Sequence, residues 1–302
     1  MSDFARDHAS GSSDVAIAFL DHLARWAASD RSPDAAAFRD ALFAELRAAQ
    51  AAQPTMALVH QFAARALDVV MTGVVRGDRP ADLRAHLAAS CAAERDDLAS
   101  GLEGVARTAC ALLERRGAWI ATLSASGAVR GAILEAKRRG LEPRALIAEG
   151  RPNLEGRALA ASLAARGVPV WLVTDAALPL LLSQAAAVWI GADAVTDAGV
   201  VNKIGSYAAA LAAREHSVPV FALAGRRKFL PAATPALRIV EMPPAEVWEA
   251  PAPGVQPRNV YFELVPMALL RGVVVEDAVL GPGEAATLAR ERALPEELAR
   301  AT

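Results

Sequence analysis

The feature that most constrains the fold is a change in hydrophobic pattern near residue 116. Before it the sequence is rich in Ala, Leu and Arg, and apolar residues recur at helical spacing, as in Phe19, Leu23 and Trp26. Short breaks containing proline divide this part at residues 30–33, 53–55 and 77–80. The pattern predicts a bundle of four or five helices.

After residue 116 short apolar runs alternate with helical patterns. Strands alternating with helices in this way are typical of a parallel sheet covered on both faces. We therefore predict an α/β protein, with a helical domain over residues 1–115 and a parallel-sheet domain over residues 116–302. The expected strands are Trp119–Leu123, Ala145–Ala148, Val168–Thr174, Ala187–Ile190, Val218–Leu223 and Val260–Val265, and the expected helices are Val129–Arg139, Glu155–Ala165, Leu178–Gln184 and Ser206–Glu215.

Composition excludes several classes of protein. The 302 residues are 54% hydrophobic and carry a net charge of −2, which argues against a nucleic-acid partner. No uncharged apolar run is long enough to span a membrane, and the N-terminus lacks the apolar core of a secretory signal. Cys91 and Cys110 form neither a disulfide framework nor a metal motif. We expect a cytoplasmic protein without metal or cofactor.

The segment 191–207 concentrates residue types that the rest of the chain avoids. It contains Asn202 and Lys203, although the whole chain has three asparagines and three lysines, and it follows a predicted strand. In parallel sheets ligands bind beyond the carboxyl ends of the strands. We interpret Asp193 as a site residue that exchanges protons with a bound hydroxyl, although an aspartate there can also cap a turn. For Asp175, which also ends a strand, we favour the cap.

Two further loops follow predicted strands. Small residues from Ser124 to Gly127 enter a helix, so their backbone N–H groups can hold an anion, and Ser126 can add a hydroxyl. An ordinary serine N-cap explains the same turn. In the next loop, Arg151 and Arg157 can clamp a phosphate or sugar acid, while a helix start with surface ion pairs is the alternative.

Taken together, these segments resemble the translation initiation factor 2B alpha/beta/delta family, which includes regulatory subunits and two kinds of sugar-phosphate isomerase. The resemblance covers nearly the whole chain, and the segment 191–207 is its most specific part. The matching segments are Ser10–Ala16, Gln53-Pro54-Thr55, Glu149–Arg157, Gly191–Tyr207 and Phe262–Pro266.

The resemblance implies a helical N-terminal domain, a Rossmann-like C-terminal domain through which the chain forms a homodimer, and a ligand site between the domains. In the isomerases of the family the site uses a cysteine after the first strand and an aspartate after the fourth. Asp193 takes the aspartate position, but the cysteine position falls on Ser124. Serine is a far weaker acid than cysteine, so it cannot take over proton transfer unchanged.

Two functions remain open. The first is aldose–ketose isomerisation of a phosphorylated pentose or related sugar, with Asp193 and Ser124 as catalytic residues. Its substrate-binding residues would be Ser126, Gly127, Arg151, Arg157, Asn202 and Lys203. The second is a non-catalytic regulatory protein that binds a sugar phosphate or nucleotide, which Ser124 favours, as do Gln53 and Glu263 where the family has other residues. Either function implies a small phosphorylated ligand.

Overall fold

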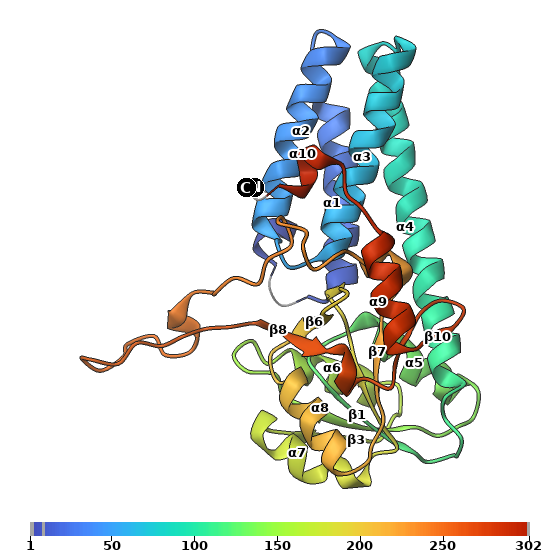
Figure 1. The fold of residues 1–302 in the computed structure, drawn as a ribbon, viewed down its shortest axis with the longest axis vertical. Helices are drawn as coiled ribbons and strands as arrows, with labels where there is room; N and C mark the ends of the chain where they lie inside the picture. Colours follow the sequence, from blue (N-terminus) through green and yellow to red (C-terminus); the bar gives the residue numbers. More distant parts are fainter. Residues whose placement is uncertain (1–2, 8–9, 301–302) are drawn as a thin grey trace. The chain divides into compact units, whose positions relative to one another are not determined.

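The computed structural model describes residues 3–7 and 10–300 (Figure 1). The chain divides into two compact units. The first, here called the helical unit, comprises residues 1–100, 233–238 and 293–302. The second, the sheet unit, comprises residues 101–232 and 239–292.

The helical unit confirms the predicted bundle. Its helices are α1 (Ser12–Ser29), α2 (Ala35–Ala52), α3 (Ala57–Arg76) and the first part of α4 (Pro80–Cys110), with the short η1 (Asp3–Arg6) and α10 (Glu296–Ala299). The residues that carry the helical spacing are its core: Phe19, Leu23, Phe38, Leu42 and Phe62 are all buried. Helix α3 is long and apolar enough by composition to cross a membrane, yet half of that stretch is buried within the protein, as in a core helix of a bundle.

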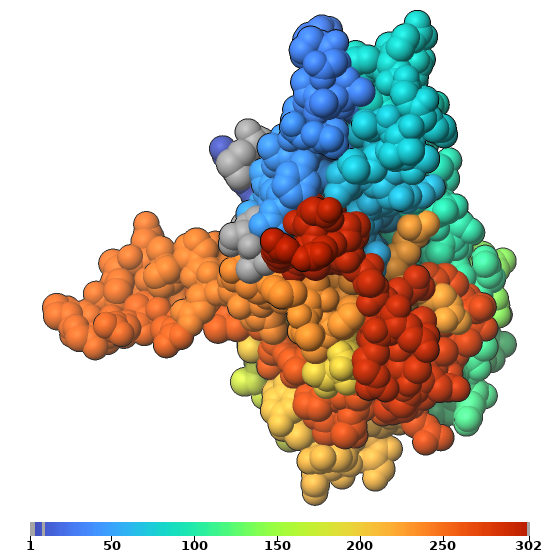
Figure 2. All heavy atoms as spheres, turned by 45° about the horizontal axis from the view of Figure 1, so that its top comes forward, coloured from blue at the N-terminus to red at the C-terminus, as the bar shows by residue number. Residues whose placement is uncertain are grey.

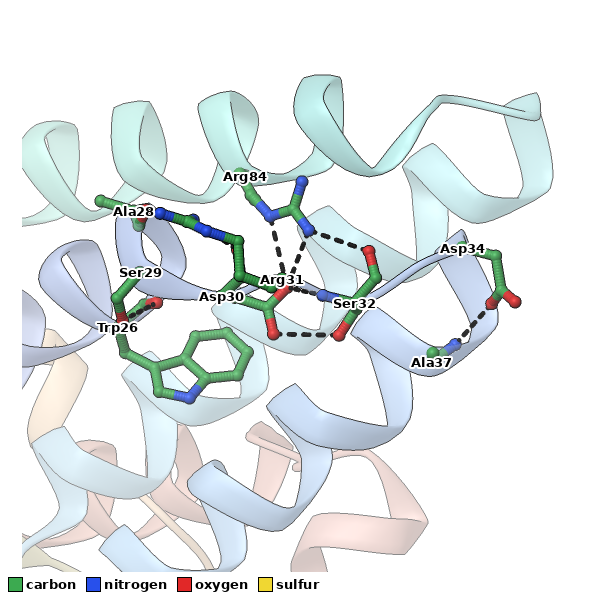
Figure 3. A network of polar contacts seen from close by, with 9 residues as sticks. All are labelled: Trp26, Ala28, Ser29, Asp30, Arg31, Ser32, Asp34, Ala37 and Arg84. Carbon is green, nitrogen blue, oxygen red and sulfur yellow. Dashed lines mark hydrogen bonds and ion pairs between the residues drawn. The ribbon is translucent and has the colours of Figure 1, made fainter.

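The turn between α1 and α2 shows how short breaks end the helices (Figure 3). The Asp30 carboxylate accepts bonds from the Ser32 backbone N–H at 2.9 Å and from the Arg84 guanidinium at 3.0 Å. Burial acts to raise the pKa of Asp30, but these hydrogen bonds hold it below its ordinary value. Asp34 then caps α2 by accepting from Ala37 N at 2.8 Å.

The sheet unit is built on a seven-stranded sheet in the order β10-β9-β7-β4-β1-β2-β3, parallel except for β10. Its strands are β1 (Trp119–Leu123), β2 (Arg144–Ala148), β3 (Val170–Val173), β4 (Ala187–Ile190), β7 (Val220–Leu223), β9 (Gly272–Val274) and β10 (Val279–Leu280). Its helices are α5 (Gly127–Arg138), α6 (Glu155–Ala164), α7 (Leu178–Leu181), α8 (Ser206–Glu215) and α9 (Pro282–Glu291). Single 3₁₀ turns lie at Asp175–Ala177, Leu182–Gln184, Arg226–Lys228, Pro244–Glu246 and Met267–Leu269.

Both faces of the central strands of this sheet are buried, as their unbroken apolar runs predict. Along β4, Val188 and Ile190 belong to a core cluster on one face, whereas Ala187 and Trp189 belong to a cluster on the other. The order in which strands are added to the sheet reverses at β1: β2 and β3 follow on one side of it, whereas β4 and β7 lie on its other side. In open α/β sheets such a reversal leaves a crevice at the carboxyl ends of the strands.

One predicted strand is assigned to the wrong sheet. The run Val260–Val265 was expected in the parallel sheet, but β8 (Phe262–Pro266) pairs antiparallel with β6 (Gly199–Lys203). With β5 (Ala194–Val195) they form a separate three-stranded sheet. An apolar run predicts a strand but not the strand with which it pairs. The partner here, β6, lies in the segment 191–207, which we had interpreted only as a ligand site.

Residues 240–258, here called the arm, form an irregular excursion (Figure 2). The two ends of the arm are joined, since Glu241 bridges to Val260 and forms an ion pair with Arg258. Between them Val247 and Trp248 are exposed.

Candidate functional site

Three of the predicted site loops meet at one edge of the seven-stranded sheet. Strand β1 lies between β2 and β4, and its last residue, Leu123, is paired with Ala148 at the end of β2. The loops that begin at Ser124, Glu149 and Gly191 therefore leave the sheet side by side.

Ser126 and Asn202 converge on Gly191. A Cβ atom added at Gly191 would lie 2.8 Å from Ser126 Oγ and 3.2 Å from Asn202 Oδ1, so no larger residue fits without displacing them. Ser126 is also the N-cap of α5 and accepts from Val129 N at 3.4 Å. This bond is the one that the N-cap interpretation of the turn expects. Before it, Ser124 is held at φ +61°, a left-handed conformation that costs energy for a residue other than glycine.

Asn202 is fixed by the start of α8. Its Nδ2 donates to Ser206 Oγ at 2.8 Å, and that hydroxyl donates to Lys203 O at 2.6 Å. Both side chains are buried. Because the amide nitrogen is occupied in this way, the Oδ1 atom is the one that faces Gly191.

Lys203 is not an isolated cation. Its Nζ lies 2.6 Å from Glu155 Oε1, and the two side chains are only 8% and 2% exposed. The same Nζ lies 4.7 Å from the ring centre of Tyr261 and 4.9 Å from that of Phe262. The predicted ligand-binding lysine is therefore held by a carboxylate and two aromatic faces.

Tyr261 is itself anchored through its hydroxyl. The hydroxyl donates to Glu246 Oε2, which belongs to the arm, and lies 3.0 Å from Asn153 Oδ1. Burial, together with the hydrogen bond to Glu246, raises the pKa of Tyr261 to about 12. The phenol accordingly stays protonated and acts as a donor at neutral pH.

The two predicted clamp arginines have separate partners. Arg157 is exposed and pairs with Glu149 at 2.7 Å, as the alternative interpretation of a surface ion pair expects. Arg151 is also exposed, and its guanidinium reaches the carbonyl of Val247 on the arm at 3.5 Å. The structure does not bring the two guanidinium groups onto a common partner.

Asp175 fixes the backbone of the same loop. Its two carboxylate oxygens accept from Gly150 N at 2.8 Å and Arg151 N at 2.7 Å. The expectation that Asp175 caps its own turn is therefore wrong, because the carboxylate crosses from the end of β3 to the loop after β2. At the end of that loop a Cβ on Gly156 would lie 1.9 Å from Ala148 O, so only glycine fits there.

Asp193 lies between β4 and β5 and is 8% exposed. Its backbone N donates to Val201 O at 2.8 Å, which places it beside the strand that carries Asn202 and Lys203. The preceding carbonyl, Ala192 O, accepts from Lys228 Nζ at 2.6 Å. Lys228 was not expected near the site, although it is one of three lysines in the chain, and neither were Glu155 and Tyr261.

Both cysteines are buried on α4, and neither lies on the loop after β1 that carries Ser124. Burial raises the pKa of Cys91 to about 12, and burial also raises the pKa of Cys110 on α4. The loop after β1 thus offers hydroxyl and backbone N–H groups, and the loop after β4 offers a buried carboxylate. Such a set can hold an oxyanion and move a hydroxyl proton.

Comparison with known proteins gives two kinds of relative. The sequence pattern of the initiation factor 2 subunit family matches residues 8–282. A Pyrococcus furiosus protein described as translation initiation factor eIF-2B subunit 2-like is 35% identical over 164 residues, 54% of this chain and 58% of that protein. A methylthioribose-1-phosphate isomerase from Synechococcus sp. (strain CC9605) is 36% identical over 183 residues, 57% of this chain and 54% of the isomerase.

Solved structures are similar over a longer span. The translation initiation factor eIF-2B of Pyrococcus horikoshii OT3 has a TM-score of 0.80 at 25% identity and covers 93% of this chain and 94% of its own. The 5-methylthioribose 1-phosphate isomerase of the same organism has a TM-score of 0.75 at 22% identity, covering 94% and 84%. The sequence matches span little more than half of each curated relative, and relatives of both kinds match equally well.

Proposed function

Because the chain belongs to the initiation factor 2 subunit family, we propose that it binds a phosphorylated sugar at the carboxyl edge of β1 and β4 and interconverts its aldose and ketose forms. The observation that carries this proposal is the convergence of Ser126 and Asn202 on Gly191, two residues before the buried Asp193. The Ser126 hydroxyl and the Asn202 carboxamide thus lie together near the start of α5, and Asp193 follows in the loop after β4. Strand ends at a reversal of sheet order are the usual ligand position in this architecture.

Each group has a role in this reaction. The backbone N–H groups of the turn from Ser124 to Gly127 hold the phosphate at the positive end of α5. Asp193 moves the proton of the sugar hydroxyl, Asn202 Oδ1 accepts a hydrogen bond from a second sugar hydroxyl, and the Lys203 ammonium stabilises the oxygen on which charge develops. Arg151, which is exposed beside the same edge, is the guanidinium we assign to an outer phosphate contact.

A panel of pentose phosphates and nucleoside monophosphates tests the binding step by thermal shift. A ligand at about 100 times its dissociation constant should add roughly 2.7 kcal/mol to the free energy of unfolding. Aldose–ketose conversion of each ligand that binds is then followed by chromatography of the two sugar forms. If no member of the panel stabilises the protein, the proposal is wrong.

The second candidate is a regulatory, non-catalytic protein. The residue types in the loop after β1 favour this function. Serine occupies position 124, and both thiols of the chain are buried with raised pKa values. Ser124→Cys distinguishes the two candidates. A catalytic protein should keep or gain activity in this variant, whereas activity that appears only in the variant identifies the native chain as a binding protein.

We also propose that the chain forms a homodimer through the sheet unit and works in the cytoplasm. Strand β3 is an edge strand of the seven-stranded sheet and exposes Trp171 (44%) and Leu172 (45%). Unpaired apolar edges are sites at which a second chain can add. Light scattering that gives 31.5 kDa at micromolar concentration contradicts the dimer.

A further inference from the structure

We propose that Glu155 is a positioning residue: its carboxylate holds the Lys203 ammonium over the rings of Tyr261 and Phe262, and so fixes the direction from which Lys203 meets a ligand. The functional part of this inference rests on the proposed ligand site. The positional part stands on the geometry alone, because all four side chains belong to the sheet unit.

Three separate segments bring these side chains together. Glu155 begins α6, Lys203 ends β6, and Phe262 is the β8 residue paired with Lys203. The connection continues past the strand, since Ile204 N donates to Tyr261 O at 2.7 Å. The two rings are therefore tied to the backbone of the lysine, whereas the carboxylate reaches it from a different part of the sequence.

Glu155 is committed to this one contact. Its Oε1 bonds Lys203, and its buried Oε2 has no hydrogen-bond partner among the residues that the structure describes. A buried carboxylate with a single bonded oxygen is costly to keep, so its retention requires a reason. Holding the ammonium supplies one, because a buried ammonium without a counter-charge would be equally costly.

The rings under the ammonium are held as well. The Tyr261 hydroxyl contacts Asn153, from the loop after β2, and Glu246, from the arm. Asn259 at the end of the arm also donates to Glu246, at 2.7 Å. The arm thus sets the plane of the Tyr261 ring, and Glu155 sets the place of the ammonium above it.

The balance of charge has a consequence for recognition. Because Glu155 neutralises Lys203 at 2.6 Å, the lysine offers a ligand directed N–H donors but little net positive charge. The ligand's phosphate is therefore attracted mainly by the backbone N–H groups at the start of α5 and by exposed arginine. Lys203 then selects ligands by the position of a sugar oxygen.

Lysine side-chain NMR tests the positioning directly on the full chain. The protein has only Lys137, Lys203 and Lys228, so ¹³C-labelled lysine gives a spectrum that Lys203→Arg assigns. Aromatic faces shift nearby protons upfield, and the Lys203 Hε signals should lie well upfield of those of Lys137. Glu155→Gln should abolish most of that shift, whereas Glu149→Gln, which changes the exposed pair with Arg157, should leave it unchanged.

Glu155→Asp keeps the buried charge, and it tests the positioning role of Glu155 if Glu155→Gln does not fold. It withdraws the carboxylate by one methylene, so part of the upfield shift should be lost. An unchanged Lys203 signal in whichever of the two variants folds overturns the positioning role. Addition of ribose 5-phosphate should also move the Lys203 signal of the wild-type protein. If ribose 5-phosphate leaves the Lys203 signal unchanged, while Glu155→Gln moves it, the ligand assignment fails and the positioning role stands.

Discussion

Four buried polar side chains make different kinds of contact in the two units. In the helical unit, Gln53 Nε2 donates to Phe4 O at 2.8 Å and Thr55 Oγ1 donates to Arg238 O at 2.8 Å, so both bond to main-chain carbonyls. In the sheet unit, Asn202 bonds to the side chain of Ser206 and Lys203 to that of Glu155.

The kind of partner indicates the role of these side chains in each unit. A side chain that satisfies a carbonyl replaces a missing secondary-structure bond and fixes the path of the chain. A side chain that bonds another side chain can be reoriented by a ligand, because neither group is part of the backbone. We therefore expect substitutions in the helical unit to change stability alone, and those at the sheet edge to change function as well.

The largest effect is expected at Asp193. Asp193→Asn, which is nearly isosteric, removes the group that moves the proton and should lower turnover by about 10²–10⁴-fold. The ligand affinity and the unfolding transition of Asp193→Asn should match those of the wild-type protein. Ser124→Ala should lower turnover less than Asp193→Asn does. Steady-state kinetics on a confirmed substrate measures this, and wild-type turnover in the variant would refute the assigned mechanism.

Lys203→Met tests whether the sheet-edge pair also matters to stability. It removes the ammonium that pairs with the buried Glu155 carboxylate, so the free energy of unfolding should fall by about 3–5 kcal/mol. The double variant with Glu155→Gln should regain much of that loss. Arg157→Met, which removes an exposed pair, should cost at most about 1 kcal/mol. Urea unfolding followed by fluorescence compares the three, and equal losses from the exposed and buried pairs would contradict this account.

His60 gives the helical unit a dependence on pH. Burial lowers the pKa of His60 from 6.5 to about 4. The unfolded chain therefore binds the extra proton first, and stability that is complete above pH 6.5 is lost as the pH falls toward 4. The loss should approach about 3 kcal/mol. In His60→Gln the free energy of unfolding should differ less between pH 7.5 and pH 4.5 than in the wild-type protein. An unchanged difference would exclude His60 as the source of the pH dependence.

The smallest effect is expected at Gln53. Gln53→Ala frees the carbonyls of Phe4 and Asp7, to which the amide donates at 2.8 and 3.0 Å, and should lower stability by about 1–2 kcal/mol. Ligand affinity, measured by calorimetry, should not change. A loss of affinity without a loss of stability would show that the contrast between the two units does not hold at this position.

The residues of the site were predictable to different degrees. Asn202 and Lys203 stood out because this chain rarely uses their residue types, and Ser126 because it follows a strand and precedes a helix. Glu155 and Tyr261 gave no such signal, since a glutamate at a helix start and an aromatic residue before a strand have ordinary structural explanations. Their role depends on contact with Lys203 across 48 and 58 residues of sequence.

The sequence by itself determined many of the elements of this protein, because hydrophobic period is a local property: the four helices of the bundle and strands such as Trp119–Leu123 follow from it, whereas β6 and β9 were not predicted. It could not determine partners between distant segments. Only the tertiary structure decided that β8 joins β6 in a separate sheet, that Asp175 holds the loop of Arg151, and that Lys203 is paired with Glu155. Those contacts depend on which chain segments meet in space, and residue types and spacing along one strand or helix do not specify that.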